Sequence, residues 1–230
     1  MSKIPEDAIQ CLDKGFVRLV DSMGGDEAIV QAARVSYGKG TTKLSQDRGL
    51  IRYLMRHRHT TPFEMVEFKF HCKMPIFVAR QWVRHRTANI NEYSLRYSEA
   101  RDEFYYPDPE HIQFQSALNK QGRMGDVPDD LKKKVQDYFK EISNRSFEIY
   151  SELNTAGVSR ELARAILPVN LYTEWYWKND LHNLLHFVGL RSDSHAQYEI
   201  RVFSDAMAES VKAVAPFAWE AYQDYAVSGL

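Results

Sequence analysis

Apolar and polar side chains alternate without interruption from Val66 to Met74. The residues between the apolar positions are Glu67, Lys69, His71 and Lys73. Because successive side chains of a strand point to opposite faces, this pattern predicts a strand with one face in the core and one in water. The β-rich run Phe16–Val20 and the aromatic run Leu171–Trp177 predict two further strands.

Other segments place apolar residues at helical spacing. Predicted helices follow the Gly24-Gly25-Asp26 turn, cover residues 43–57, run from Pro75 towards Trp82, cover 131–153 and 159–167, and begin at Leu181 and at Ala196. Residues 101–130 are rich in proline, glycine and polar side chains, which predicts a long surface excursion. Strands and helices do not alternate regularly, so we expect one α+β domain over residues 1–230, built on a central, twisted, mainly antiparallel sheet.

Composition excludes several classes of protein. The 230 residues carry 30 basic and 31 acidic side chains, so no global field recruits nucleic acid or an anionic membrane. Two cysteines are too few for a disulfide framework, and the N-terminus lacks the apolar stretch of a signal peptide. No run approaches the roughly 18 apolar residues that a membrane span needs. We expect a soluble, cytoplasmic protein.

The segment from Arg84 to Arg96 carries the densest candidate chemistry. It reads Arg-His-Arg-Thr-Ala-Asn-Ile-Asn-Glu-Tyr-Ser-Leu-Arg. Forked cations suit phosphate, and the carboxylate, amide and hydroxyl suit the polar edges of a planar ligand. On charge alone, two arginines around a histidine also fit a solvated helix C-terminus.

The spacing of Arg84-His85-Arg86, seven residues and then Ser94 resembles the signature motif of the flavin-dependent thymidylate synthases. Further blocks that resemble this family, in family order, are 33–36, 59–64, 79–82, 167–173 and 190–197. The resemblance implies a homotetramer that binds FAD outside a Rossmann fold, and no Gly-x-Gly-x-x-Gly loop occurs here. It implies methylation of dUMP to dTMP, with methylenetetrahydrofolate as the carbon donor and NADPH as the reductant of the flavin.

The family pattern assigns site residues position by position. The residues that it places at the flavin are Ser36, Thr61, Glu64, Arg84, His85, Arg86, Asn91, Glu92, Asp180, Leu181, His182 and His186. Those that it places at dUMP are Gln81, Trp82, Val83, Arg84, Glu92, Tyr93, Ser94, Leu95, Arg96, Arg164 and Arg191. Arg191 resembles the family residue that stabilises the ionised uracil ring, and is the predicted catalytic residue.

Several alternatives stay open at this stage. His59 resembles a family histidine near the flavin, Trp82 is also a candidate for packing, and Asp180 is a family departure that could cap the next helix. Ser94 lacks an evident base and is assigned to binding, whereas Cys72 falls on the apolar face of its strand. Competing functions are RNA binding through the basic run 56–59 and the Arg84 segment, and metal-dependent hydrolysis through His182 and His186.

Overall fold

A five-stranded sheet forms the centre of the computed structural model, which describes residues 4–35, 44–117 and 122–225. Its strands lie in the order β1-β2-β3-β7-β4, and every neighbouring pair is antiparallel. The bounds are β1 Ile9–Cys11, β2 Gly15–Met23, β3 Glu67–Pro75, β4 Asn89–Glu92 and β7 Tyr172–Asp180. The predicted α+β class with a mainly antiparallel sheet is confirmed.

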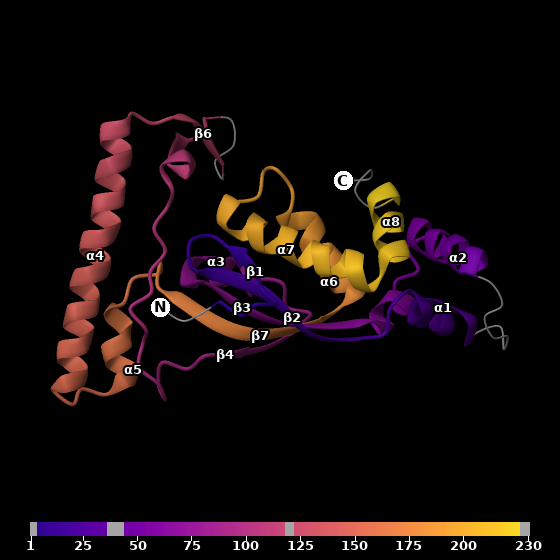
Figure 1. The fold of residues 1–230 in the computed structure, drawn as a ribbon, viewed down its shortest axis with the longest axis horizontal. Coiled ribbons are helices and arrows are strands. Elements are labelled where there is room, and N and C mark those ends of the chain that lie inside the picture. Colours follow the sequence, from indigo (N-terminus) through magenta and orange to yellow (C-terminus); the bar gives the residue numbers. More distant parts are fainter. Residues whose placement is uncertain (1–3, 36–43, 118–121, 226–230) are drawn as a thin grey trace.

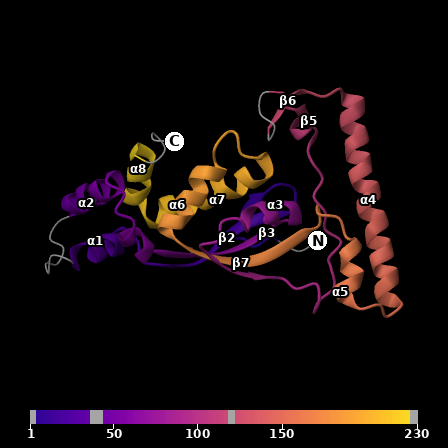
Figure 2. The same cartoon turned by 180° about the vertical axis from the view of Figure 1, so that it is seen from behind.

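Helices cover one face of this sheet and both of its ends. Their bounds are α1 Asp26–Arg34, α2 Leu44–Arg56, α3 Ile76–Trp82, α4 Asp129–Thr155, α5 Arg160–Ala163, α6 Leu181–Arg191, α7 Tyr198–Val214 and α8 Pro216–Tyr225. Helices α3, α6 and α7 lie over the sheet, while α1, α2 and α8 gather at one end and α4 and α5 at the other (Figures 1 and 2). None of the helices in the described ranges is both long and apolar enough to cross a membrane.

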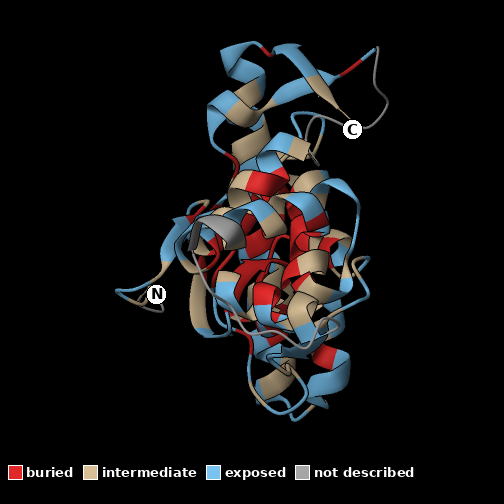
Figure 3. Ribbon diagram, turned by 90° about the vertical axis from the view of Figure 1, so that its right-hand side faces the viewer, coloured by how far each residue is buried: buried red, intermediate tan, exposed pale blue. Residues whose placement is uncertain are grey.

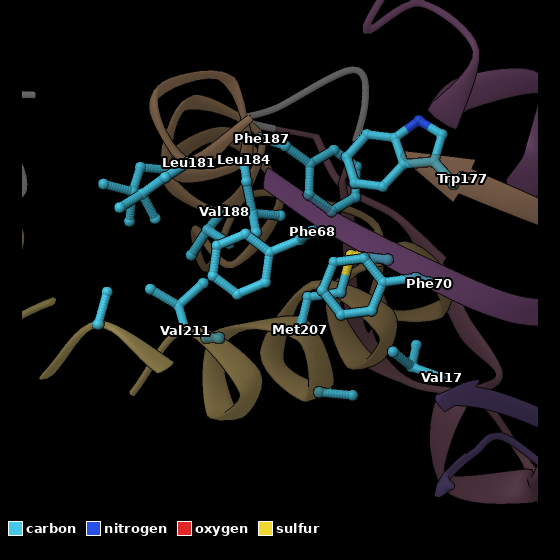
Figure 4. Close-up of a cluster of buried hydrophobic side chains, with 14 of the residues drawn as sticks. Val17, Phe68, Phe70, Trp177, Leu181, Leu184, Phe187, Val188, Met207 and Val211 are labelled. Atoms are coloured by element: carbon cyan, nitrogen blue, oxygen red, sulfur yellow. The ribbon is translucent and has the colours of Figure 1, made fainter. Parts of the chain in front are cut away.

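The core lies between the covered face of the sheet and helices α6 and α7. Phe68 and Phe70 of β3 stack at a ring distance of 6.0 Å and meet Trp177, Phe187 and Met207 (Figure 4). Buried residues are concentrated in the middle of the molecule (Figure 3). The alternation of β3 therefore predicted its buried face correctly, because burying apolar area is the dominant stabilising term.

One polar position of β3 departs from that pattern. The structure buries Lys73, predicted to face water, and its Nζ lies 2.7 Å from the carboxylate of buried Glu103. Glu103 belongs to the proline-rich excursion, which crosses the sheet at this point. A buried cation needs such a partner. The ion pair with Glu103, thirty residues further along the chain, therefore determines the environment of Lys73.

Four strands were not predicted, of which β1 is the first in the chain. The Arg84–Arg96 segment contains the edge strand β4, and the excursion contains a hairpin of β5 (Gln113–Gln115) and β6 (Arg123–Asp126). The helix predicted from Ala196 is two helices, since Pro216 begins α8 after Ala215 leaves helical geometry. Short strands of this kind depend on tertiary pairing more than on apolar period.

Candidate functional site

The Arg84–Arg96 segment connects α3 to the exposed edge of the sheet. Trp82 ends α3, and β4 then pairs with β7 so that Asn91 lies opposite Tyr176 and Glu92 opposite Trp175. Strand β7 continues directly into α6, because Leu181 follows Asp180 without a loop. The motif and the helix that carries Arg191 are thus brought together by one antiparallel pair of strands.

His85 and Arg191 are in direct contact, although 106 residues separate them. Nε of Arg191 donates to Nε2 of His85 at 3.0 Å, and the His85 ring lies 4.9 Å from Phe187 and 6.1 Å from His186. Burial, followed by the charge of Arg191 and then by His186, lowers the pKa of His85 to about 4. His85 is therefore a neutral acceptor near pH 7 and keeps its proton on Nδ1.

We expect the His85 imidazole to titrate near pH 4 in the unliganded protein, well below the usual value of about 6.5. Between these two values the unfolded chain binds more protons than the folded one, so stability should fall as the pH drops from 6.5 towards 4. NMR titration of the imidazole Cε1–H measures the pKa, and urea unfolding against pH measures the linkage. A His85→Asn variant should show a shallower slope in this window. A pKa near 6.5 would contradict the partly buried contact with Arg191.

The two arginines beside His85 are exposed. Within the described ranges, neither Arg84 nor Arg86 forms an ion pair or a side-chain hydrogen bond. Arg191 is half-buried, and burial lowers its pKa. Guanidinium groups without carboxylate partners are donors for an anion, and forked donors fit a phosphate or an ionised heterocycle.

Residues 92–96 lie along the same edge of the sheet. Oε1 of Glu92 accepts a 2.7 Å hydrogen bond from the Thr173 hydroxyl, which orients the carboxylate. The Ser94 Oγ accepts from the backbone N–H of Arg96 at 3.3 Å, and the Arg96 guanidinium lies 3.6 Å from Glu161. Both side chains of that ion pair are exposed, so a stronger anion can displace Glu161 at little cost.

At the start of α6, Asp180 is a helix cap. Its carboxylate accepts from the backbone N–H of Asn183 at 2.9 Å and from Nδ2 of Asn183 at 2.8 Å. Leu181 is buried, and its N–H donates to Val66 O at 2.8 Å. The adjacent 3-10 turn η2 (Thr61–Met65) carries the other predicted flavin residues of this region, exposed Thr61 and partly exposed Glu64.

Trp82 is fully buried, with 0% of its surface exposed. Its ring packs against Trp175, Trp177, Phe187 and Phe203 at centroid distances of 5.1 to 5.9 Å. The packing role considered from the sequence is confirmed. The cysteines are also structural: burial raises the pKa of Cys72 well above its usual value and that of Cys11 to about 12.

The chain does not bring all predicted site residues together. Arg164 begins the 3-10 turn η4 (Arg164–Ile166), which directly follows α5 (Figure 1). No hydrogen bond or ion pair within the described ranges joins Arg164 to the Arg84–Arg96 segment. Ser36 lies outside the described residues. The predicted flavin and dUMP residues therefore lie on several elements: α3, β4 and the loop after it, η2, α6 and η4.

Two residues next to the site, Gln197 and Glu199, were given no role in the sequence analysis. Gln81 donates through Nε2 to Oε1 of Gln197, and Nε2 of Gln197 donates to Glu199 at 2.8 Å. Gln197 belongs to a block that resembles the family. No sequence pattern indicated a role for Glu199, because only the fold brings it close to α3. Gln197 and Glu199 line a cavity of about 750 Å³ between α4 and α7, whose wall also includes Tyr105, Arg123, Tyr138 and Ile142.

Among the described residues, His182 and His186 belong to no cluster of three metal ligands, so the alternative metal site is not formed there. Within the described ranges, the only group of three carboxylate, histidine or cysteine ligands within 4.8 Å is Asp108, Glu110 and His111, which lies outside α6. The basic run 56–59 ends α2, where the rings of His57 and His59 pack beside Tyr53. The basic run 56–59 is separated from the Arg84–Arg96 segment by β3 and α3 and shares no strand with it.

Comparison with known proteins gives consistent matches. The model of the family Thy1, thymidylate synthase complementing protein, matches residues 18–217. A flavin-dependent thymidylate synthase from Rickettsia conorii (strain ATCC VR-613 / Malish 7) is 54% identical over 242 residues, covering 100% of this chain and 82% of that relative. A protein of the same name from Ehrlichia ruminantium (strain Gardel) is 59% identical over 214 residues, covering 93% and 72%.

A solved structure has the same fold. The crystal structure of a UMP/dUMP methylase, PolB, from Streptomyces cacaoi bound with 5-Br dUMP superposes with a TM-score of 0.85 at 34% identity. The match covers 94% of this chain and 98% of that one. At this identity and coverage, the similarity extends beyond the bare fold to the sequence of the segments that form it.

Proposed function

Because the chain belongs to the thymidylate synthase complementing protein family, Thy1, we propose that it is a flavin-dependent thymidylate synthase that methylates dUMP to dTMP. The observation that carries the proposal is the contact of Arg191 with neutral His85 between two unpaired arginines of the signature motif. Methylenetetrahydrofolate is the proposed carbon donor and NADPH the proposed reductant. The catalytic domain comprises residues 1–230, and the protein acts in the cytoplasm.

Arg191 has the central role in the proposed chemistry. Carbon C5 of uracil is a poor nucleophile until the ring carries negative charge, and a half-buried cation stabilises that charge more strongly than an exposed one. His85 accepts from Nε of Arg191 and leaves the two terminal nitrogens of the guanidinium for the ring. Because His85 is neutral, it orients Arg191 without competing for the anion.

The remaining motif residues hold the ligands. The exposed guanidinium groups of Arg84 and Arg86 suit the FAD diphosphate, and Arg96, released from Glu161, suits the dUMP phosphate. Glu92, held by Thr173, offers acceptors to ligand hydroxyl or N–H groups. The donor set at this edge therefore fits a flavin nucleotide, and bound FAD, once reduced by NADPH, would supply the hydride that completes the methyl group.

The site is proposed to be shared between copies of the chain in a homotetramer. Within the described residues, no hydrogen bond or ion pair joins Arg164 to Arg191, and we infer that another copy of the chain supplies it. Large apolar side chains are exposed on α4, on α5 and on the turns that follow α5, as expected of a subunit interface. They are Tyr138, Ile142, Leu162, Ile166 and Val169.

A visible absorption spectrum tests the proposed function. The purified protein, loaded with FAD, should absorb near 450 nm and bleach with NADPH, and it should release tritium from [5-³H]dUMP when methylenetetrahydrofolate is added. A protein that cannot be loaded with FAD, or that releases no tritium, would contradict the proposal. Salt-sensitive binding to random single-stranded RNA without a response to dUMP would instead support RNA binding.

Ser94→Ala should weaken dUMP binding by roughly tenfold or less while turnover remains measurable, because the hydroxyl contributes one hydrogen bond and has no adjacent base. Its only described side-chain contact in this segment is with the N–H of Arg96. Tritium release at saturating dUMP measures the chemistry separately from binding. Loss of all tritium release with dUMP still bound would identify Ser94 as a nucleophile. Ser98→Ala, on the same loop, is the matched control.

A further inference from the structure

A chain of hydrogen bonds runs from Gln81 into the interior of the molecule. Gln81 donates to Gln197, Gln197 donates to Glu199 at 2.8 Å, and Glu199 is 3% exposed. Glu199 also forms an ion pair with Arg123 of the β5–β6 hairpin, and its Oε1 accepts from the Tyr105 hydroxyl at 3.1 Å. The excursion that resembles no family block is thus connected, through Glu199 and Gln197, to Gln81, which the family pattern places at dUMP.

The direction of these hydrogen bonds follows from the carboxylate. An ionised carboxylate only accepts, so Gln197 must turn its NH₂ group towards Glu199 and its carbonyl oxygen towards Gln81. Gln81 must then turn its own NH₂ group towards Gln197. An amide that could otherwise bind in two orientations is held in one, because the opposite orientation would place two acceptors against each other.

We propose that Glu199 is a positioning residue that acts through Gln197 and sets which polar atoms of the Gln81 amide face dUMP. The inference rests on the proposed function, which places Gln81 at the substrate. Arg123 has a supporting part: it balances the charge of Glu199, and its second terminal nitrogen is held by the His111 carbonyl at 2.7 Å. The hairpin therefore contributes to the substrate site without touching the substrate.

A double-mutant cycle on the FAD-loaded protein tests this role, with dUMP dissociation constants measured by calorimetry. Glu199→Gln keeps the volume of the side chain but removes the fixed direction of the relay. It should weaken dUMP binding about three- to tenfold, the range expected for one misdirected hydrogen bond. In a Gln81→Ala background the same substitution should change the dissociation constant less than about twofold, because the group it orients is gone.

Glu209→Gln, the same change at an exposed position of α7, is the matched control and should leave binding unchanged. Equal weakening by Glu199→Gln in both backgrounds would assign Glu199 a merely structural role, and no weakening in either would also overturn the inference. If Glu199→Gln does not fold, Gln197→Met interrupts the relay at its middle and takes its place in the cycle. A wild-type protein that binds no dUMP would instead refute the proposed function itself.

Discussion

Arg191→Lys should lower kcat/KM for dUMP methylation by about 10²- to 10³-fold while leaving the fold intact. In the wild type, Nε of Arg191 donates to His85, which leaves the terminal nitrogens for the substrate. A lysine has one compact ammonium, which cannot donate to His85 and also present a planar fork to the ring. Release of tritium from [5-³H]dUMP measures the loss directly.

Arg201→Lys on α7 is the matched control for this experiment, since Arg201 donates only to the exposed Ser194 carbonyl among the residues described. It should retain near-normal turnover. The flavin spectrum of Arg191→Lys should also remain that of the wild type, which separates a defect in substrate activation from a defect in cofactor binding. Turnover within about threefold of wild type would remove Arg191 from its proposed role.

Trp82→Ala should lower the free energy of unfolding by about 3–5 kcal/mol, the cost typical of truncating a buried aromatic side chain. The ring is fully buried and contacts Trp175, Phe187 and Phe203, so the substitution leaves a large cavity beneath the site. Urea unfolding at a fixed protein concentration measures the change.

Two further variants separate packing from ligand binding at this position. Tyr97→Ala, at a residue with 79% of its surface exposed, should change stability by less than about 1 kcal/mol. Trp82→Phe keeps part of the aromatic packing and should retain dUMP binding, since the indole does not reach the surface. A stable Trp82→Ala protein that no longer binds dUMP would contradict the packing role and support a direct contact.

Local pattern was enough to predict the central strands. The alternation from Val66 to Met74 placed Phe68 and Phe70 in the core because side-chain direction in a strand depends only on position along the chain. The same argument was wrong for Lys73, whose neighbour Glu103 lies in a segment without regular period. Strand β4 was also missed, since its four residues pair only through β7.

The candidate site was likewise predicted only in part from the sequence. Sequence motifs identified Arg84, His85 and Arg191 as separate candidates. Their roles depend on which of their atoms are in contact. The contact between Arg191 and His85 determines that the imidazole is neutral, because burial and a nearby cation both disfavour its protonation. The capping role considered for Asp180 from the sequence is confirmed, since its carboxylate accepts from the backbone N–H of Asn183 at the start of α6.

By itself, the sequence determined the family, the fold class and the residue types available to bind a flavin and a nucleotide, because these follow from local pattern and motif spacing. Only the tertiary structure decided that Trp82 is core, that Lys73 is buried and paired, and that Glu199 lies behind Gln81. Each of these depends on segments far apart in the chain. Their environments are set by long-range packing, which no local spacing encodes.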